Sequence, residues 1–298
     1  AQNEARYYEV RRMDVRLAPA LEAFVPAMGL SRIAFEGNHL PYRLYDEVSR
    51  SVGNATMVPT YDLVDRIRAI KGPQELEAIR QAVALADAAF AHVLTIVTPG
   101  MTERQLVWEM ESFLRQNGSE GVAFDTIVAS GPNASMPHHV PGERPLQAGE
   151  PIIIDWGARV RGYCSDITRT IVLGEADQKL REIYNTVLQA QEKAEARIKA
   201  GMQGAKADGI ARKVIEDAGH GDSFGHGLGH GVGLAIHESP RVGRASQDIL
   251  EDGMVFSVEP GIYLPGWGGV RIEDLATLRG GKVIVLTRSP KQLEAMEV

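Results

Sequence analysis

The sequence predicts a mixed α/β protein of two domains, a smaller one over residues 1–71 and a larger one over residues 72–298. Three observations lead to this prediction. The larger part alternates amphipathic helices with short apolar strands, several of its strands end in acidic residues, and the order of two helices followed by such strands occurs twice. The repetition predicts two similar α/β halves around one shared site, each supplying two carboxylates.

The smaller domain shows helix and strand patterns in alternation. Helices are predicted near residues 11–26 and 41–52, and strands at Arg32–Glu36 and Ala55–Pro59. This order predicts a small α/β domain ahead of the larger one.

The larger domain begins with two helices whose ends are marked by capping residues. Gly72 and Pro73 open the first helix, which is predicted to run to about Val97. The second helix begins at Thr102, which forms a capping box with Gln105. The later predicted elements are the strand Phe124–Ala129 and the helices near 176–199 and 206–218.

Two aspartates flank a predicted hairpin. The apolar run Pro151–Ile154 predicts a buried strand that ends at Asp155, and residues 159–162 predict a four-residue loop. Pairing around this loop places Asp155 opposite Asp166, and directly opposed residues of an antiparallel pair point to the same face. The two carboxylates are therefore expected to lie together.

Two glutamates follow a similar plan. A strand is predicted at Met254–Glu259, and the Gly- and Pro-rich residues 261–269 predict a turn. The alternation after this turn places Arg271 and Glu273 on one face of a further strand. We expect the arginine to orient the acidic side chains beside it.

The four acids together predict a metal site, although a lone acid is most often a solvated surface charge. Carboxylates gathered in an apolar interior repel one another and have raised pKa values, which bound cations relieve. Four carboxylates balance the charge of two divalent ions. Oxygen-rich ligands favour Mn²⁺, Co²⁺ or Zn²⁺ over soft metals, without choosing among the three.

Four motifs carry a family resemblance: DWGARVRGYCSDITRT, HGLGHGVGLAIHESPR, VEPGIY and GGVRIED. They resemble the metal-site motifs of the pita-bread metallopeptidases, which include methionine aminopeptidase, aminopeptidase P and prolidase. The resemblance covers about residues 72–290 and implies a pita-bread catalytic domain of two pseudo-symmetric α/β halves. Residues 1–71 resemble the end of a creatinase-type N-terminal domain, and we expect that the natural protein has further residues before them.

The resemblance implies a role for each ligand. Asp155 would bind one metal, His230 and Glu259 would bind the other, and Asp166 and Glu273 would bridge both. A metal-bridging hydroxide would be the nucleophile, with Glu259 also carrying a proton.

The resemblance also assigns the other histidines, which residue type alone would leave as structural or exposed. His237 would contact the substrate carbonyl, and His226 would line the pocket. His138 matches a substrate-contacting position, but His139 follows it where glycine is common in the family, so either of the two could reach the substrate.

The substrate is predicted from three further positions. Phe124 and Ile127 match the proline pocket of prolidase-like members, although both could equally be ordinary core residues. Arg241 matches a substrate-binding arginine of archaeal-type prolidases, and its guanidinium group suits the free C-terminal carboxylate of a dipeptide. The resemblance therefore implies an Xaa-Pro dipeptidase acting on short proline-containing peptides. The alternatives are an aminopeptidase P, which acts on longer peptides, and an inactive protein-binding relative that has lost its metal ligands.

Composition excludes several other classes. A net charge of −7 without a basic run argues against nucleic-acid binding. The one cysteine, Cys164, allows no internal disulfide and lacks a catalytic partner in the sequence, which suits a cytoplasmic location. The most apolar helical stretch, residues 82–97, is interrupted by Asp87 and His92, so no membrane span is predicted. A homodimer is expected.

Overall fold

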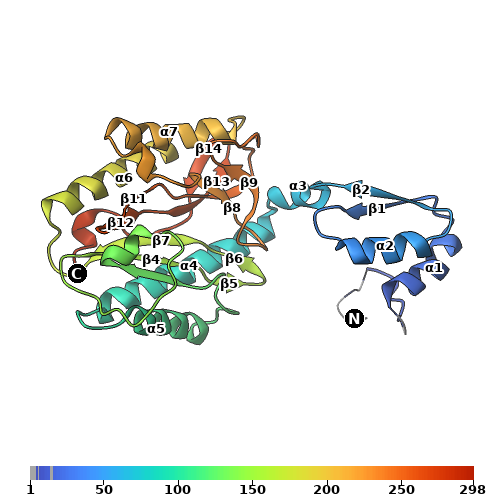
Figure 1. Cartoon of the computed structure of the whole chain (residues 1–298), viewed down its shortest axis with the longest axis horizontal. Coiled ribbons are helices and arrows are strands. Elements are labelled where there is room, and N and C mark those ends of the chain that lie inside the picture. Colours follow the sequence, from blue (N-terminus) through green and yellow to red (C-terminus); the bar gives the residue numbers. More distant parts are fainter. Residues whose placement is uncertain (1–4, 6, 14–15) are drawn as a thin grey trace. The chain divides into compact units, whose positions relative to one another are not determined.

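The structure is a computed structural model that describes residue 5, residues 7–13 and residues 16–298. The chain divides into two compact units, Ala1–Arg66 and Ile67–Val298 (Figure 1). The helix α3 (Leu63–Ala69) contains the boundary between them.

The first unit contains two helices on a small parallel sheet. Its buried residues Ala18, Val25, Val48 and Val52 come from the helices α1 and α2, and partly buried residues of the strands pack against them. The helix predicted near 11–26 begins only at Leu17, because the backbone of Arg16 is extended. The elements are α1 (Leu17–Ala27), β1 (Arg32–Glu36), α2 (Tyr42–Ser51) and β2 (Thr56–Thr60).

The second unit consists of two halves, each with two helices and a sheet. The first half has an antiparallel sheet in the order β3-β4-β7. Its elements are α4 (Pro73–Ile96), α5 (Glu103–Gln116), β3 (Ile127–Ser130), β4 (Pro151–Trp156), β5 (Arg159–Val160), β6 (Tyr163–Cys164) and β7 (Ile167–Val172).

The second half has a five-stranded sheet in the order β14-β13-β10-β8-β9, together with the hairpin β11-β12. Its helices are α6 (Gln178–Arg197) and α7 (Gly204–Asp217). Its strands are β8 (Gly229–Gly231), β9 (Glu238–Val242), β10 (Val255–Val258), β11 (Gly261–Leu264), β12 (Gly268–Arg271), β13 (Asp274–Arg279) and β14 (Lys282–Val285).

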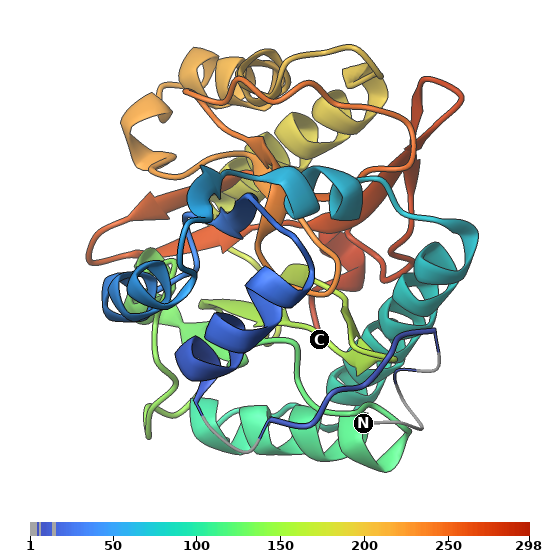
Figure 2. The same cartoon turned by 90° about the vertical axis from the view of Figure 1, so that its right-hand side faces the viewer.

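One hydrophobic core joins the two halves. It includes Phe90, Leu106 and Ile154 of the first half and Tyr184 and Phe256 of the second. Figures 1 and 2 show α6 and α7 on one side of the strands and α5 on the opposite side. The halves are therefore two lobes of a single packed body, as the repeated pattern predicts.

The helix α4 is long and apolar enough to cross a membrane by length and composition alone. Its apolar face instead lies in the protein core, where Phe90 stacks on Trp156 with ring centroids 5.1 Å apart. The Trp156 indole also donates a hydrogen bond to the Ala86 carbonyl at 3.0 Å. These contacts are those of a buried core helix.

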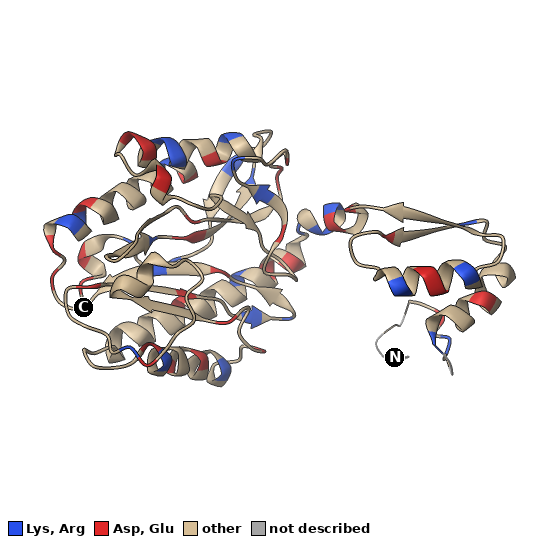
Figure 3. Cartoon of the chain, in the orientation of Figure 1, with Lys and Arg blue, Asp and Glu red and all other residues tan. Residues whose placement is uncertain are grey.

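Sequence capping signals fix the starts of the first two helices of the second unit. The Thr102 hydroxyl accepts from the Gln105 amide at 3.2 Å, and the Gln105 side chain accepts from the Thr102 amide at 2.8 Å. The Gly72 amide donates to Glu75 at 2.8 Å at the start of α4. Figure 3 shows Lys and Arg interspersed with Asp and Glu on the outer helices of this unit.

The predicted hairpin register between the two aspartates is wrong by two residues. Asp155 pairs with Thr168, and the loop contains only Arg161 and Gly162, both with positive φ (51° and 79°). Two residues in this conformation make a turn whose twist matches the paired strands. Because side chains alternate along a strand, a shift of two residues leaves Asp166 on the expected face.

Two other boundaries differ from the prediction. The strand predicted from Phe124 begins at Ile127. Residues 261–269 were predicted as a turn throughout, but most of them form the hairpin β11-β12, in which Ile262 pairs with Val270. The apolar residues Ile262 and Val270 are fully buried, which outweighs the turn tendency of the surrounding glycines.

Candidate metal centre

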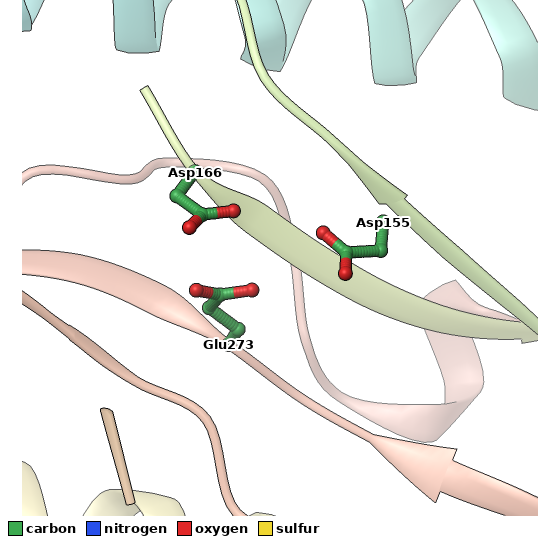
Figure 4. A group of neighbouring side chains, drawn as sticks. All are labelled: Asp155, Asp166 and Glu273. Atoms are coloured by element: carbon green, nitrogen blue, oxygen red, sulfur yellow. The ribbon is translucent and has the colours of Figure 1, made fainter. Parts of the chain in front are cut away.

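Three carboxylates from three chain segments meet between the halves. Asp155 lies in β4, Asp166 precedes β7, and Glu273 connects β12 to β13. Each contributes an oxygen atom, and these oxygens all lie within 4.8 Å of one another. Figure 4 shows the three carboxylates pointing toward one another. Such a cluster of oxygen atoms is what a divalent cation binds.

His230 and Glu259 extend this cluster. The His230 Nε2 atom lies 3.5 Å from an oxygen of Asp166 and 3.4 Å from an oxygen of Glu259. The other ring nitrogen, Nδ1, donates to the Gly231 carbonyl at 3.1 Å. Because burial lowers the pKa of His230, the ring is neutral, and its Nε2 lone pair is directed toward the carboxylates.

Glycines on both sides of His230 let its strand approach its neighbours. A Cβ atom at Gly229 would lie 2.0 Å from the Ser257 carbonyl oxygen, and one at Gly231 would lie 2.2 Å from that of Ser239. No larger residue fits at either position without moving the backbone. The glycine-dense motif therefore positions the histidine at the cluster.

The charge balance fits bound cations. Burial, followed by repulsion from Glu273 and Asp155, raises the pKa of Asp166 well above its usual value, and burial likewise raises those of Glu273 and Glu259. One oxygen of Asp155 and one of Glu273 are buried without a hydrogen-bond partner. Among the described residues lining the cavity, only Arg271 carries a permanent positive charge. The four acids therefore lack positive charge that divalent ions would supply.

Arg271 contacts the acids directly and through Thr168. Its Nη2 atom donates to Asp155 at 2.5 Å, and its Nε atom donates to the Thr168 hydroxyl at 3.0 Å. Thr168 in turn donates to Glu273 at 2.7 Å. The arginine thus fixes the orientation of one acid directly and of another through Thr168.

Three supporting residues were missed in the sequence. Thr168 lies two residues from Asp166, and Ser257, whose hydroxyl donates to Glu259 at 3.0 Å, lies two residues from that acid. Strand alternation places each on the face of the neighbouring acid, which is a signal that could have identified them. Tyr263 accepts from Arg271 at 3.0 Å, and no local pattern predicts that contact.

One cavity of about 410 Å³ contains most of the predicted site. His237 lies against the proposed ligand His230, with ring centroids 4.2 Å apart. The lining includes all five proposed ligands and the predicted substrate-contacting residues Phe124, Ile127, His138, His226 and His237. The structure therefore brings acids, histidines and an apolar wall into one space.

The two consecutive histidines have different surroundings. His138 lines the cavity. The His139 ring instead lies 2.8 Å from a carboxylate oxygen of Glu103, at the start of α5. The structure thus favours His138 as the residue that faces a substrate.

Glu238, which follows His237, belongs to a buried ion cluster. It accepts from Lys71 Nζ at 2.7 Å and from Arg68 Nη2 at 2.6 Å. The side chains of Lys71 and Glu238 are 1% and 5% exposed. This cluster anchors the chain beside His237.

Arg241 is not brought into the cavity with the acids. It lies in β9, is exposed, and lines a neighbouring cavity of about 490 Å³. That second cavity shares His226 and Gly227 with the first.

Cys164 is a buried free thiol whose sulfur lies 3.9 Å from the Leu234 carbonyl oxygen.

A buried cluster of four carboxylates and one histidine between two α/β lobes defines a metal-dependent hydrolase. Comparison with known families agrees with this class. Residues 77–279 match metallopeptidase family M24, and residues 1–70 match the creatinase/prolidase N-terminal domain. The chain belongs to metallopeptidase family M24.

Individual relatives cover most of the chain. An Xaa-Pro dipeptidase from Pyrococcus horikoshii is 40% identical over 288 residues, which are 96% of this chain and 81% of that protein. The structure of an Xaa-Pro dipeptidase from Bacillus anthracis is similar with a TM-score of 0.95 and 41% identity, over 98% of this chain and 82% of that one. An X-Pro aminopeptidase from Thermotoga maritima has a TM-score of 0.89 and 37% identity, over 96% of this chain and 81% of that one.

Proposed function

We propose that this chain hydrolyses the Xaa-Pro bond of dipeptides with two divalent metal ions. The observation that carries the proposal is a cavity lined by the five proposed metal ligands and by the apolar residues Phe124 and Ile127. An Xaa-Pro amide has no N–H group, so an apolar wall leaves no buried donor without a partner. The dipeptidases among the relatives support the same substrate.

The ligand assignment is part of the proposal. Asp155 would bind one ion, His230 and Glu259 the other, and Asp166 and Glu273 both. When bound, the cations would polarise the scissile carbonyl and lower the pKa of a shared water to roughly 7. Mn²⁺, Co²⁺ and Zn²⁺ all suit these ligands.

The other side chains would act on the substrate. His237 would donate a hydrogen bond to the carbonyl oxygen as negative charge develops there. Burial lowers the pKa of His237, so it would donate as a neutral imidazole. Glu259 would carry a proton toward the leaving nitrogen, and His138 would hydrogen-bond the substrate near the scissile amide. His226, which lines both cavities, would contact the bound peptide.

The second candidate is an aminopeptidase that removes the first residue from longer Xaa-Pro peptides. The similarity to the Thermotoga maritima X-Pro aminopeptidase favours it. So does the position of Arg241, which lines the neighbouring cavity rather than the one with the acids. The two candidates differ in whether the C-terminal carboxylate lies beside the proline or further out.

A matched peptide series tests both candidates. Xaa-Pro dipeptides, Xaa-Pro-Xaa tripeptides and Xaa-Ala dipeptides would be compared with Mn²⁺, Co²⁺ and Zn²⁺, and the Xaa-Pro dipeptides are expected to give the highest kcat/KM. A preference for tripeptides would favour the aminopeptidase. A protein that hydrolyses none of these peptides with any of the three metals would contradict both candidates.

Substitution of Arg241 sharpens this test. If Arg241 binds the C-terminal carboxylate, Arg241→Ala should lower kcat/KM for dipeptides by about 10–150-fold and leave tripeptides nearly unaffected. Arg244 lines the same second cavity and is also exposed, so Arg244→Ala is the matched control. Equal losses on both peptide lengths would assign Arg241 a structural role.

Three further properties stay predictions. A homodimer would give twice the chain mass in sedimentation equilibrium. A cytoplasmic location is consistent with the one free thiol, Cys164. The domain boundary between residues 71 and 72 also stays a prediction, which limited proteolysis around this position would check.

A further inference from the structure

The segment that carries His138 has little regular structure of its own. It leaves β3 at Ser130, forms a short 3-10 helix (Gly131–Ser135), and continues without helix or strand through Gly142. Pro137 and His138 of this segment line the cavity. A segment without regular structure depends on contacts with the rest of the protein to hold one position.

Those contacts converge on one buried carboxylate. Glu103, the first residue of α5, is fully buried. One of its oxygens accepts from the Ser130 amide at 2.9 Å, the Ser130 hydroxyl at 2.8 Å and the Asn133 side chain at 3.0 Å. The other accepts from the Gly142 amide at 3.0 Å and the His139 ring at 2.8 Å. Glu103 therefore binds the start, the middle and the end of the segment.

The bond to Glu103 holds His139 outside the lining of the cavity. A carboxylate only accepts hydrogen bonds, so the His139 Nε2 atom donates to Glu103. The His139 amide also donates to the Met136 carbonyl at 3.1 Å. With His139 held on the α5 side, His138 lies on the cavity side.

We infer that Glu103 and His139 are positioning residues that hold His138 at the cavity. Neither lines the cavity, so each would act through His138 rather than on the substrate. The inference rests on the proposed function for its effect on catalysis. Its structural part, the placement of the His138 ring, stands independently and is measured independently.

The catalytic effect is tested by a double-mutant cycle on the best Xaa-Pro peptide. His139→Ala is expected to lower kcat/KM by about 10–100-fold, since a displacement of about 1 Å can cost 100-fold. In a His138→Ala background the same change should have little further effect, within about 2-fold. If the losses in kcat/KM of the two single variants multiply in the double variant, the catalytic part of the inference is overturned. His139→Gln keeps a donor and should recover part of the loss.

The placement of the ring is tested without any substrate. Selective ¹⁵N-histidine labelling gives NMR signals from eight histidines, and His138→Ala assigns the one of interest. His139→Ala and Glu103→Gln are expected to shift the His138 ring signals. Ser135→Ala is the matched control, because its hydroxyl bonds only within the segment, to the Pro132 carbonyl. An unchanged His138 signal in His139→Ala would overturn the inference, even if the peptides proved to be the wrong substrates.

Glu103→Gln serves as the second variant. The amide keeps one acceptor and brings two hydrogens against a set of five donors, so it should have a larger effect than His139→Ala. Thermal unfolding would check that the variant is folded. A folded Glu103→Gln protein with normal kcat/KM and a normal His138 signal would contradict the inference.

Discussion

Two neighbouring buried carboxylates, Glu273 and Asp274, have opposite electrostatic surroundings. Burial, and then repulsion from Glu259 and Asp155, raise the pKa of Glu273 well above its usual value. Asp274 is equally buried, but Arg169 and Lys291 more than offset its burial and hold its pKa at about 2. Two consecutive residues thus differ in their partners: Asp274 is paired with the two cationic side chains Arg169 and Lys291, and Glu273 is not.

The contacts of Asp274 are those of a structural ion cluster. Arg169 Nη2 lies 2.6 Å from one of its oxygens, and Lys291 Nζ lies 2.7 Å from the other. The Gln191 side chain donates a further hydrogen bond at 3.0 Å. The difference shows that Asp274, which supports the fold, is paired with two cationic side chains. Among the described residues, no Lys or Arg side chain forms an ion pair with the proposed metal ligand Glu273.

The largest effect is expected from removing Asp166, a buried acid whose pKa is raised as that of Glu273 is. Asp166→Ala should abolish hydrolysis and lower the occupancy of both metal positions, because this residue is proposed to bridge the two ions. Metal content by mass spectrometry and peptide hydrolysis would measure the two effects. Full activity in this variant, or a saturated wild-type protein with one ion per chain, would contradict the two-ion centre.

A smaller effect is expected at the compensated acid. Asp274→Asn leaves Arg169 and Lys291 buried with less compensation, which should lower the free energy of unfolding by about 3–5 kcal/mol. Glu273→Gln in metal-free protein removes a carboxylate that repels its neighbours, and should be neutral or stabilising. Urea denaturation of both variants after chelation of metals would compare them. Equal destabilisation would remove the distinction between the two sites.

The pH dependence of stability should show the smallest effect and the same contrast. The pKa values of Asp166 and Glu273 are raised in the folded protein. Their contribution to the free energy of unfolding is therefore fully present below their pKa values in the unfolded chain, about 4, and is lost as the pH rises through their pKa values in the folded protein. The folded pKa of Asp274 is depressed, so its contribution is present above about 4 and is lost as pH falls toward about 2.

Metal-free protein should therefore be most stable at mildly acidic pH. Each kcal/mol by which the free energy of unfolding falls toward neutral pH corresponds to a decrease of roughly 2–4 °C in Tm. Thermal unfolding with a chelator between pH 4 and 8 would measure the curve. Glu273→Gln should reduce the fall in Tm between mildly acidic and neutral pH. A Tm of the metal-free protein that rises steadily to pH 8 would contradict the raised pKa values of Asp166 and Glu273.

The sequence predicted well the features that depend on local pattern. The helix starts at Pro73 and Thr102 follow from capping residues, and the structure has both. The register between Asp155 and Asp166 was wrong, yet their shared face was right, because the alternation of side chains tolerates a shift of two. The motifs also located acids and histidines that now line one cavity.

Contacts between distant residues escaped prediction. Glu103 and His139 are 36 residues apart, and Thr168 and Glu273 are 105 apart. Such pairs depend on how whole elements pack, which no local period or cap specifies. The position of Arg241 outside the main cavity escaped for the same reason, since the motif fixes its place in the chain but not the direction of β9.

The core shared by the two lobes has a consequence for synthesis of the protein. The buried residues Leu106 and Ile154 pack in the same cluster as Phe256, more than a hundred residues later in the chain. Val172 of the first lobe accepts a hydrogen bond from Val298 at 2.9 Å. Until residues 256–298 are synthesised, a ribosome-bound first lobe would therefore expose apolar surface and the aspartates Asp155 and Asp166. Acquisition of the metals would mark the end of folding rather than start it.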